Sequence, residues 1–376
     1  MLQFSKYHGL GNDFLIIDGR SWPANFMFAN PDPEWVRHLC DRHFGVGADG
    51  VIIILSPTLE GDWRMRIFNA DGTEAQMCGN GIRCISKFLA DSDKVMVGHK
   101  WKIETLAGII VSELKENDMI YVDMGIPILS PHDIPTRLSV GQDNIAIGLI
   151  ETNGITWSVA AAGMGNPHIV IPVKDAEDID IEKFGPLLEE HFAFPTQTNV
   201  HFLQVIEHNH LKLRTWERGV GVTFACGTGA CAALIVAHSL GLSDKEAQID
   251  LPGGSLLVNW ETIDNHISII GSAKAIFDGV LTPELTPIVS EVAQTFNEIE
   301  KVEMVEENIP TFEKVLCTIV CVNGCLHPDN CPSLKARINV SDFLNKHSLD
   351  EMLALANDSI ESRLRAKSET DAQTSI

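Results

Sequence analysis

A motif that occurs twice, far apart in the chain, constrains the fold more than any other feature of this sequence. Cys78 is followed by Gly-Asn-Gly and a helix-like segment over 82–90, and Cys226 is followed by Gly-Thr-Gly and a helix-like segment over 232–240. A cysteine just before a helix N-terminus faces free backbone N–H groups and the positive end of the helix dipole. Such a place favours an anion, either a thiolate or a bound carboxylate.

The repetition extends upstream of both cysteines. An aromatic residue, Phe68 or Trp216, stands at the same distance before each cysteine, and Gly-Leu-Gly-Asn at 9–12 matches Gly-Met-Gly-Asn at 163–166. Two motifs in the same order in each half indicate an internal repeat, and its period is too long for a solenoid. We therefore predict two similar domains. If they face each other, their cysteines flank one ligand.

The spacing of apolar and turn-forming residues predicts mixed helices and strands around these motifs. Helices are expected over 31–43, 82–90, 181–191 and 232–240, and strands over 2–7, 14–18, 51–55, 63–68, 101–107, 109–114, 120–124, 201–206, 211–216, 256–260 and 267–277. A proline-rich stretch over 125–135 is the expected crossover between the domains. After about residue 278 the chain becomes rich in glutamate and contains scattered cysteines.

Composition excludes several classes of protein. The net charge of −23 argues against a nucleic-acid-binding surface, which would be basic. No apolar segment reaches membrane-spanning length, and the first residues lack the pattern of a secretory signal. Nine cysteines, an odd number, fit a reducing compartment better than a disulfide framework. We expect a cytoplasmic protein without nucleic-acid or membrane partners.

Two thiols on opposite sides of one carbon suggest two-base proton exchange. One thiolate removes a proton, the other thiol delivers one to the opposite face, and the carbon is inverted. Helix N-termini that hold a carboxylate stabilise the developing charge, so neither a metal nor a carbonyl cofactor is needed. Lowering a thiol pKa from about 8.5 to about 7 requires roughly 2 kcal/mol, which a partly buried helix N-terminus supplies.

Other residues near the two motifs are ambiguous on their own. Cys84 and Cys231 fall inside the helix-like segments and are interpreted as inert core residues. His168 follows Gly-Asn-Pro and is either a core histidine or a site residue. Glu217 and Arg218 end an apolar strand just before the second cysteine motif, where they suggest substrate binding rather than a surface ion pair.

At these motifs the sequence resembles the diaminopimelate epimerases, which are cofactor-independent amino-acid epimerases of lysine and peptidoglycan synthesis. The likeness covers about residues 1–279. Its marks are Gly-Leu-Gly-Asn-Asp-Phe at 9–14, Asp-Arg-His-Phe-Gly-Val-Gly-Ala-Asp at 41–49, Phe-Asn-Ala-Asp-Gly at 68–72, Met-Cys-Gly-Asn-Gly at 77–81, Gly-Asn-Pro-His at 165–168, Trp-Glu-Arg-Gly at 216–219 and Ala-Cys-Gly-Thr-Gly at 225–229.

The resemblance implies a fold of class α/β (α+β) with two pseudo-symmetric domains, each a curved mixed sheet around a central helix. The N-terminal domain would span 1–125, completed by about 268–279, and the C-terminal domain 126–267. Residues 280–376 would be a C-terminal extension of unknown role. A homodimer acting on a small amino-acid substrate is implied as well.

The resemblance also implies that LL- and meso-diaminopimelate are interconverted, with Cys78 and Cys226 as the acid/base pair. Gly79, Asn80, Gly227 and Thr228 would offer backbone N–H groups to the reacting carboxylate. The remaining polar groups of the substrate would be bound by Asn12, Asn69, Asn166, Asn199, Glu217 and Arg218. His168 and Glu217 would tune the protonation of the thiols.

The sequence departs from the family pattern in two places. Gly50 stands where some members have a substrate-contacting glutamine, so that contact is open. The extension carries Cys321, Cys325, His327 and Cys331, which are residue types that bind zinc. Because their spacing lacks a Cys-x-x-Cys knuckle, we interpret the cysteines as reduced structural thiols and predict no metal site.

Two rival functions remain open at this stage. One is a proline-type racemase or hydroxyproline epimerase, which also uses paired cysteines on this architecture. The other is a non-catalytic redox or ligand-binding protein on the same scaffold, in which two facing thiols form a disulfide.

Overall fold

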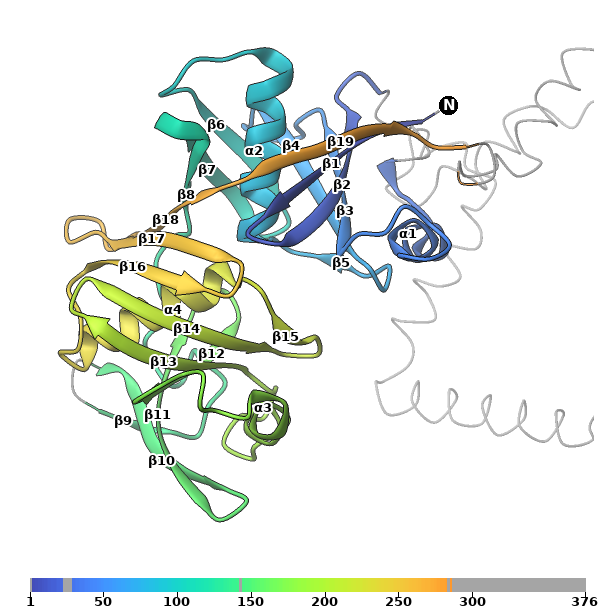
Figure 1. Cartoon of the computed structure of the whole chain (residues 1–376). Coiled ribbons are helices and arrows are strands. Elements are labelled where there is room, and N and C mark those ends of the chain that lie inside the picture. The colour runs from blue at the N-terminus through green and yellow to red at the C-terminus, as the bar shows by residue number, and fades with distance from the viewer. Residues whose placement is uncertain (1, 23–28, 142–143, 283–284, 286–376) are drawn as a thin grey trace, which may run out of the picture. The chain divides into compact units, whose positions relative to one another are not determined.

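The computed structural model describes residues 2–22, 29–141, 144–282 and 285 (Figure 1). Residues 1–288 form one compact unit. Nearly all of the predicted extension, including its four zinc-type residues, lies outside the described residues. Within the described part of the chain, we find no helix with the length and apolar character needed to cross a bilayer.

The first half of the compact unit contains eight strands and two α-helices that position Cys78. They are β1 (Gln3–Gly9), β2 (Asn12–Gly19), α1 (Pro33–Cys40), β3 (Gly50–Leu55), β4 (Trp63–Asn69), β5 (Glu74–Ala75), α2 (Gly79–Asp93), β6 (Lys100–Thr105), β7 (Gly108–Leu114) and β8 (Met119–Asp123). Cys78 is the residue immediately before α2.

The second half positions Cys226 in the same way. It contains β9 (Ser139–Val140), β10 (Ala146–Thr152), β11 (Ile155–Gly163), β12 (Pro167–Val173), α3 (Ile181–Glu189), β13 (Asn199–Glu207), β14 (His210–Glu217), β15 (Gly221–Thr223), α4 (Gly227–Ser239), β16 (Glu246–Leu251), β17 (Gly254–Trp260), β18 (Ile267–Ser272) and β19 (Lys274–Val280). Cys226 immediately precedes α4.

Strand pairing confirms the internal repeat element by element. In the first half β2 and β3 pair in parallel, as do β4 and β6. In the second half β12 and β13 pair in parallel, as do β14 and β16. A short strand precedes each cysteine: β5 pairs with β4 before Cys78, and β15 pairs with β14 before Cys226. The predicted pair of similar α+β halves is therefore correct.

The two halves share one hydrogen-bonded sheet through β18. This strand pairs with β17 on one side and with β8 on the other, and β19 then pairs with β1. The single strand predicted over 267–277 is thus two strands, which meet at Ala273. The chain thereby returns to the first half, where β18 pairs with β8 and β19 pairs with β1.

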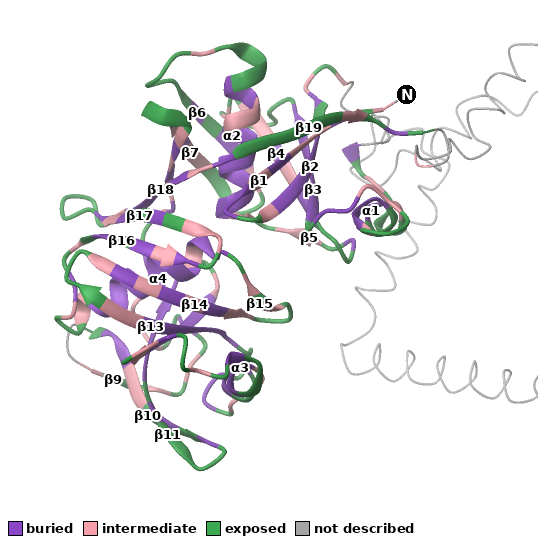
Figure 2. Cartoon of the chain, in the orientation of Figure 1, coloured by how far each residue is buried: buried purple, intermediate pink, exposed green. Residues whose placement is uncertain are grey.

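Each half places one helix on either face of its curved sheet. Along β2, Phe14 and Ile16 join the apolar cluster around α2, whereas Leu15 and Ile17 join the cluster around α1. This alternation is the period of two that a strand buried on both faces must show. Figure 2 shows α2 and α4 mostly buried among the strands. Both helices therefore lie in the core, so their N-termini have fixed positions.

Both cysteine-bearing helices begin earlier than predicted. They start at Gly79 and Gly227 rather than within the apolar runs, and α2 continues to Asp93. Packing explains the glycines in these first turns. A Cβ on Gly81 would lie 2.9 Å from the Cδ1 of Ile67. Helix α1 is shorter than the predicted 31–43, because Asp32 caps its start by accepting from the backbone N–H of Glu34.

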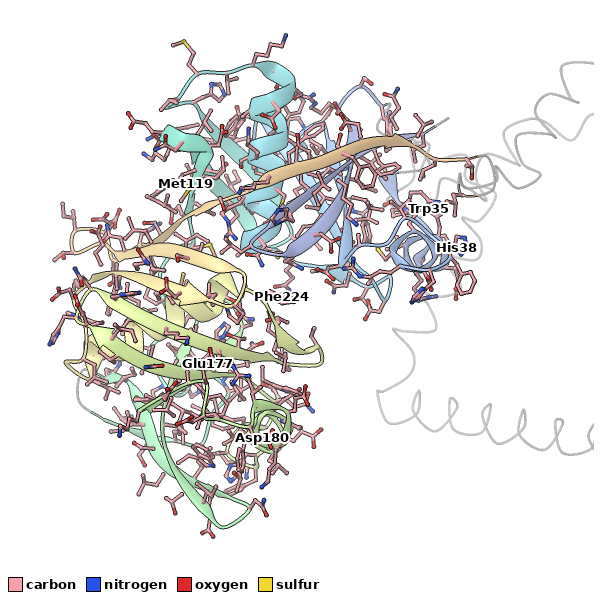
Figure 3. The ribbon with its side chains drawn as sticks, in the orientation of Figure 1. Trp35, His38, Met119, Glu177, Asp180 and Phe224 are labelled. Atoms are coloured by element: carbon pink, nitrogen blue, oxygen red, sulfur yellow. The ribbon has the colours of Figure 1, made fainter. Side chains whose placement is uncertain are left out.

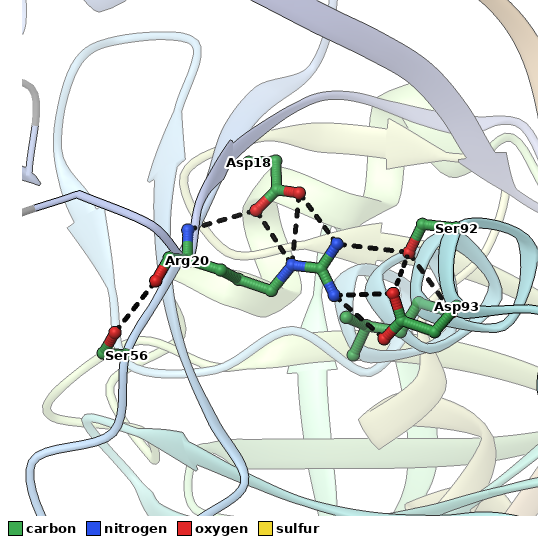
Figure 4. Close-up of polar contacts among 6 residues, drawn as sticks. Asp18, Arg20, Ser56, Ser92 and Asp93 are labelled. Carbon is green, nitrogen blue, oxygen red and sulfur yellow. Dashed lines mark hydrogen bonds and ion pairs between the residues drawn. The ribbon is translucent and has the colours of Figure 1, made fainter.

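Arg20, just after β2, fixes the far end of α2. Its guanidinium donates to the carboxylates of Asp18 and Asp93, with Nη1 2.8 Å from Asp93 Oδ1 (Figure 4). Asp93 is the last residue of the helix that starts beside Cys78. An arginine thus holds the C-terminal end of α2 at the molecular surface, well away from the cysteine.

Candidate active site

The two cysteines cap equivalent helices in the same conformation. Cys78 and Cys226 have extended backbone angles, and neither side chain caps its helix. The first turn of each helix contains no acidic residue. The first backbone N–H groups of α2 and α4 therefore keep the positive end of each helix dipole uncompensated by a side chain, as an anion site requires.

The starts of α2 and α4 touch each other at two glycines. A Cβ on Gly227 would lie 3.8 Å from the Cα of Gly79 and 3.4 Å from the Cδ1 of Ile269. Both glycines are buried. A Cβ on Gly227 would thus make ordinary van der Waals contact with the start of the other helix, which shows how close the two helix starts lie. The two cysteine motifs, which are 148 positions apart (226 − 78) in the sequence, are thus brought together.

The side chain of Asn80 joins the two motifs. Its Nδ2 donates to the carbonyl oxygen of Ala225 at 2.9 Å and to the Oδ1 of Asn12 at 3.2 Å. Ala225 directly precedes Cys226, and the Sγ of Cys78 lies 3.9 Å from the same Asn12 oxygen. The predicted site residues Asn12, Asn80 and the two cysteines therefore form one connected group.

Burial raises the pKa of both thiols. Desolvation is the largest influence on Cys78 and on Cys226, and the nearby Glu217 carboxylate raises both pKa values further. Backbone N–H groups of the following helices act in the opposite direction. The expected lowering of the thiol pKa by the helix N-terminus is wrong for this structure, because desolvation outweighs the stabilisation of up to about 2 kcal/mol that a helix end supplies.

Glu217 lies beside the second thiol. The hydroxyl of Thr223 donates to its Oε1 at 2.6 Å, and its carboxylate interacts with Cys226. Burial raises the pKa of Glu217, while those two contacts lower it. A carboxylate in this position favours the protonated form of Cys226, because a neighbouring negative charge disfavours a thiolate.

Asn12 is held in one orientation by a charged cluster at the start of β2. Its Nδ2 donates to the Oδ2 of Asp49 at 3.0 Å, which leaves its Oδ1 toward Asn80 and Cys78. Arg42 in turn bridges Asp49 and Asp13, with Nη2 2.8 and 2.7 Å from their carboxylates. The amide of Asn12 is therefore preorganised rather than free to rotate.

His168 belongs to a buried chain of hydrogen bonds. Its Nε2 lies 2.7 Å from the Oδ1 of Asn166, and its Nδ1 lies 2.9 Å from the Nε2 of His201. The Nδ1 of His201 lies 3.0 Å from the Thr215 hydroxyl. Because the Asn166 oxygen only accepts, His168 donates from Nε2, and His201 must then donate from Nε2 as well. Both rings are neutral, since burial lowers the pKa of His168 far below its usual value and that of His201 to about 3.

The loop after β14 is held by hydrogen bonds to the side chains of Asn199 and Glu189. The backbone N–H of Arg218 donates to the Oδ1 of Asn199 at 3.0 Å, and the Nδ2 of Asn199 donates to the Pro167 carbonyl at 2.9 Å. The buried Glu189 accepts from Trp216 Nε1 at 2.7 Å and from the Gly219 N–H at 2.9 Å. Asn199 thus positions Arg218 through its main chain, while the guanidinium of Arg218 is exposed.

Of the remaining predicted residues, Thr228 contacts a cysteine, whereas Asn69 contacts its own turn. Thr228 places its hydroxyl oxygen 3.5 Å from the Cys226 sulfur. The exposed Asn69 donates to the Thr73 hydroxyl at 3.0 Å and pairs in register with Gly50. A Cβ on Gly50 would lie 2.5 Å from the Phe68 carbonyl oxygen, so the backbone itself excludes a side chain there.

Four supporting residues escaped the sequence interpretation. Arg42 and Asp49 belong to a motif that marks the family resemblance but were assigned no role, Glu189 ends an ordinary amphipathic helix, and His201 occupies a strand. None carries a local pattern that signals a site, because their contacts come from distant segments. Phe224, labelled in Figure 3, was also missed. Its Cβ would contact a side chain on Gly11 from the other half at 3.3 Å.

Comparison with known proteins agrees with this geometry. The sequence profile described as diaminopimelate epimerase matches residues 4–129 and 160–276. A protein of Prochlorococcus marinus named diaminopimelate epimerase is 54% identical over 292 residues, which cover 78% of this chain and 96% of the relative. One from Oryza sativa, named diaminopimelate epimerase, chloroplastic, is 44% identical over 285 residues, or 74% of this chain and 79% of the relative.

Solved structures support the same fold. A Bacillus anthracis phenazine biosynthesis protein of the PhzF family superposes with a TM-score of 0.53 at 19% identity, covering 75% of this chain and 99% of that one. A hydroxyproline epimerase from Agrobacterium vitis gives 0.52 at 16% identity, with 74% and 91% covered. These similarities concern architecture alone. The profile match and the sequence identities, together with the paired cysteine motifs, show that the chain belongs to the diaminopimelate epimerase family.

Proposed function

We propose that the protein interconverts LL- and meso-diaminopimelate by two-base proton transfer between Cys78 and Cys226. The observation that carries this proposal is the pairing of two cysteine-capped helices whose starts meet at Gly79 and Gly227. A carboxylate bound between those starts would receive backbone N–H groups from both helices. Its α-carbon would then lie between two thiols that come from opposite halves of the molecule.

The chemical step balances within the two thiols. One cysteine, as thiolate, takes the α-proton and becomes a thiol, while the other gives its proton to the opposite face and becomes a thiolate. The product is inverted at one carbon, and the site is left with the reverse protonation. Backbone N–H groups of Gly79, Asn80, Gly227 and Thr228 stabilise the charge that moves onto the carboxylate. Glu217 beside Cys226 favours that cysteine as the thiol at the start of a turnover.

A thiolate in this buried site needs positive charge nearby, because desolvation raises both thiol pKa values. The α-ammonium group of a bound amino acid supplies one such charge. It would also lower the pKa of the α-carbon. Substrate binding and thiol activation are thereby coupled, which protects the thiolate from side reactions until substrate is present.

The polar residues around the centre support a substrate with a second amino-acid head. Asn69, Asn166 and Arg218 offer amide and guanidinium groups in addition to the helix N-termini. The amide of Asn166 accepts from His168 through its oxygen, so its nitrogen is left to donate. Asn69 now donates to the Thr73 hydroxyl and Arg218 to the Thr196 carbonyl, and both could turn to a second head. A proline-type substrate has no such head, which disfavours the racemase alternative.

The test is a substrate panel with reduced enzyme. LL-diaminopimelate, L-proline and trans-4-hydroxy-L-proline are each incubated, and inversion is followed by chiral chromatography. We expect meso-diaminopimelate only, with activity lost in Cys78→Ala and in Cys226→Ala while Cys84→Ala remains active. Inversion of L-proline or trans-4-hydroxy-L-proline would contradict diaminopimelate as the substrate and favour the racemase alternative. No inversion of any amino acid would favour the redox or ligand-binding scaffold instead.

We further propose a homodimer in a reducing, cytoplasmic compartment. Strand β19 supports the dimer, because among the described strands it pairs only with β1 and exposes Ile276 and Phe277 by 50% and 47%. The five described cysteines are free, which fits reducing conditions. Light scattering on the full chain tests the oligomeric state, and a monomer at micromolar concentration would contradict it.

A further inference from the structure

Arg83 is the largest fully buried side chain of the described residues, and it lies between the two cysteine motifs. It belongs to the first turns of α2 and is 0% exposed. No carboxylate in the described part of the chain forms an ion pair with it. Burying a charge without a counter-ion is costly, so a sequence retains one only where the charge or its hydrogen bonds are needed.

The guanidinium orients Asn80. Its Nη2 donates to the Oδ1 of Asn80 at 2.7 Å, which forces the amide nitrogen toward Ala225 and Asn12. Its Nη1 approaches the Gly79 carbonyl oxygen at 3.4 Å, and its Nε approaches that of Ser272 at 3.5 Å. The Arg83 guanidinium on the amide oxygen and the Ala225 carbonyl on the amide nitrogen thus fix the same orientation of Asn80 from both ends.

The fold leaves space for this side chain at three glycines. A Cβ would lie 3.3 Å from Nη2 at Gly9, 3.2 Å from Nε at Gly271 and 4.0 Å from Nη1 at Gly227. These glycines come from β1, β18 and the start of α4, so all three segments close around one guanidinium. The contacts form a built slot rather than an incidental fit.

We propose that Arg83 is a positioning residue for the epimerase reaction, which fixes the Asn80 bridge between the two cysteine motifs and places a permanent positive charge beside both helix starts. This inference rests on the proposed function. It adds a second source of positive charge to the substrate ammonium. The charge is present before substrate binds, because a guanidinium stays protonated in proteins even where burial lowers its pKa, as it does for Arg83.

The charged groups around Arg83 and Cys78 are consistent with this role. Arg83 faces three thiols, those of Cys78 and Cys84 from α2 and of Cys231 from α4. It opposes the rise in the pKa of Cys78, whereas the Glu217 carboxylate from β14 adds to that rise. Desolvation remains the largest influence on the Cys78 pKa, and the buried cation and the Glu217 carboxylate shift that pKa in opposite directions.

The test measures the reactivity of Cys78 separately from catalysis. The rate of alkylation of Cys78 by iodoacetamide is followed against pH by peptide mass spectrometry in wild type, Arg83→Gln and Arg83→Lys. The pH at the inflection of this rate profile, called the inflection of Cys78, should rise by about one unit in Arg83→Gln. It should rise by less in Arg83→Lys, which keeps the charge. kcat/KM with LL-diaminopimelate should fall about 100-fold in Arg83→Gln and be partly rescued in Arg83→Lys.

Arg20→Gln is the matched control, because Arg20 contacts the opposite end of the same helix. It should lower stability without moving the inflection of Cys78. If Arg83→Gln folds and leaves the inflection unchanged, the electrostatic role is refuted. If Arg83→Gln does not fold, the test rests on Arg83→Lys. A Cys78 inflection that does not move in Arg83→Lys would then refute the electrostatic role, and kcat/KM equal to wild type in that variant would refute the orienting role. If the wild type does not act on LL-diaminopimelate but the variants still shift the inflection of Cys78, the proposed function is wrong, while the electrostatic role of Arg83 stands.

Discussion

The Nδ2 of Asn80 donates to the carbonyl oxygen of Ala225 across a distance of 2.9 Å. Asn80 is the second residue of α2, and Ala225 immediately precedes Cys226. One amide group therefore ties the helix that follows the first cysteine to the backbone that carries the second. The distance between the two thiols depends on this bridge as well as on the contact of the helix starts.

Removing the bridge should damage catalysis more than stability. Asn80→Ala loses the hydrogen bonds to Ala225, Asn12 and Arg83 and leaves buried groups unsatisfied, at about 1–3 kcal/mol. We expect kcat/KM to fall about 100-fold or more, since small misplacements of reacting groups are costly. Steady-state kinetics measure the change in kcat/KM, and urea unfolding measures the change in the free energy of unfolding. Full activity in a folded Asn80→Ala protein would contradict the bridge.

The loop that carries Glu217 and Arg218 should depend on a buried carboxylate. In Glu189→Gln an amide replaces one of the oxygens that accept from Trp216 and Gly219, so one N–H group loses its acceptor. We expect KM to rise about tenfold with kcat largely kept, which corresponds to about 1.4 kcal/mol. The neighbouring Glu190→Gln, at an exposed position, is the matched control and should behave as wild type. Equal KM values in both variants would refute the loop anchor.

The buried histidine pair should make the protein sensitive to mild acid. His168 and His201 have lowered pKa values in the folded state, so only the unfolded chain takes up protons as the pH falls below about 6.5. Their contribution to stability is therefore complete above that pH and is lost progressively below it, by up to about 1.4 kcal/mol per pH unit for each ring. Arg218 also opposes protonation of His168.

Two measurements check the histidine prediction. Nitrogen-15 NMR should show both rings neutral, with the proton on Nε2, between pH 5 and 8, roughly the range in which a free histidine titrates. Urea unfolding at several pH values should show a weaker loss of stability with acid in His201→Gln than in wild type. A ring of either residue that titrates near pH 6.5 in the folded protein would show the interpretation to be wrong.

The charged cluster beneath Asn12 should stabilise the protein only above acidic pH. Burial opposes ionisation of Asp13, but hydrogen bonds from Arg42 and Lys6 outweigh it and lower its pKa to about 2. A lowered carboxyl pKa gives stability that is present above the unfolded value of about 3.9 and lost as the pH falls toward 2. Asp13→Asn should therefore be less stable than wild type at pH 6, with the difference shrinking toward pH 2.5. A difference that does not vary with pH would contradict this account.

The sequence predicted the fold and the meeting of the two cysteine motifs because local patterns encode both. The repeated Cys-Gly-x-Gly motifs identified two similar halves, and periodicity identified most strands. The helix starts were misplaced because Gly79 and Gly227 serve the contact between helices, which no local pattern encodes. Arg83 and Glu189 were missed for the same reason. Each is defined by what a distant segment places beside it. The raised thiol pKa values likewise depend on burial, which appears only in three dimensions.

The central claim is that two thiols act on opposite faces of one carbon, and solvent deuterium tests it most directly. LL-diaminopimelate is incubated with reduced enzyme in deuterium oxide, and both isomers are analysed by mass spectrometry at low conversion. The two-base account predicts deuterium at the α-carbon of the meso product, while the recovered LL substrate remains protiated. Early product that keeps the substrate proton would contradict it, because one base would then have moved the same proton between the two faces.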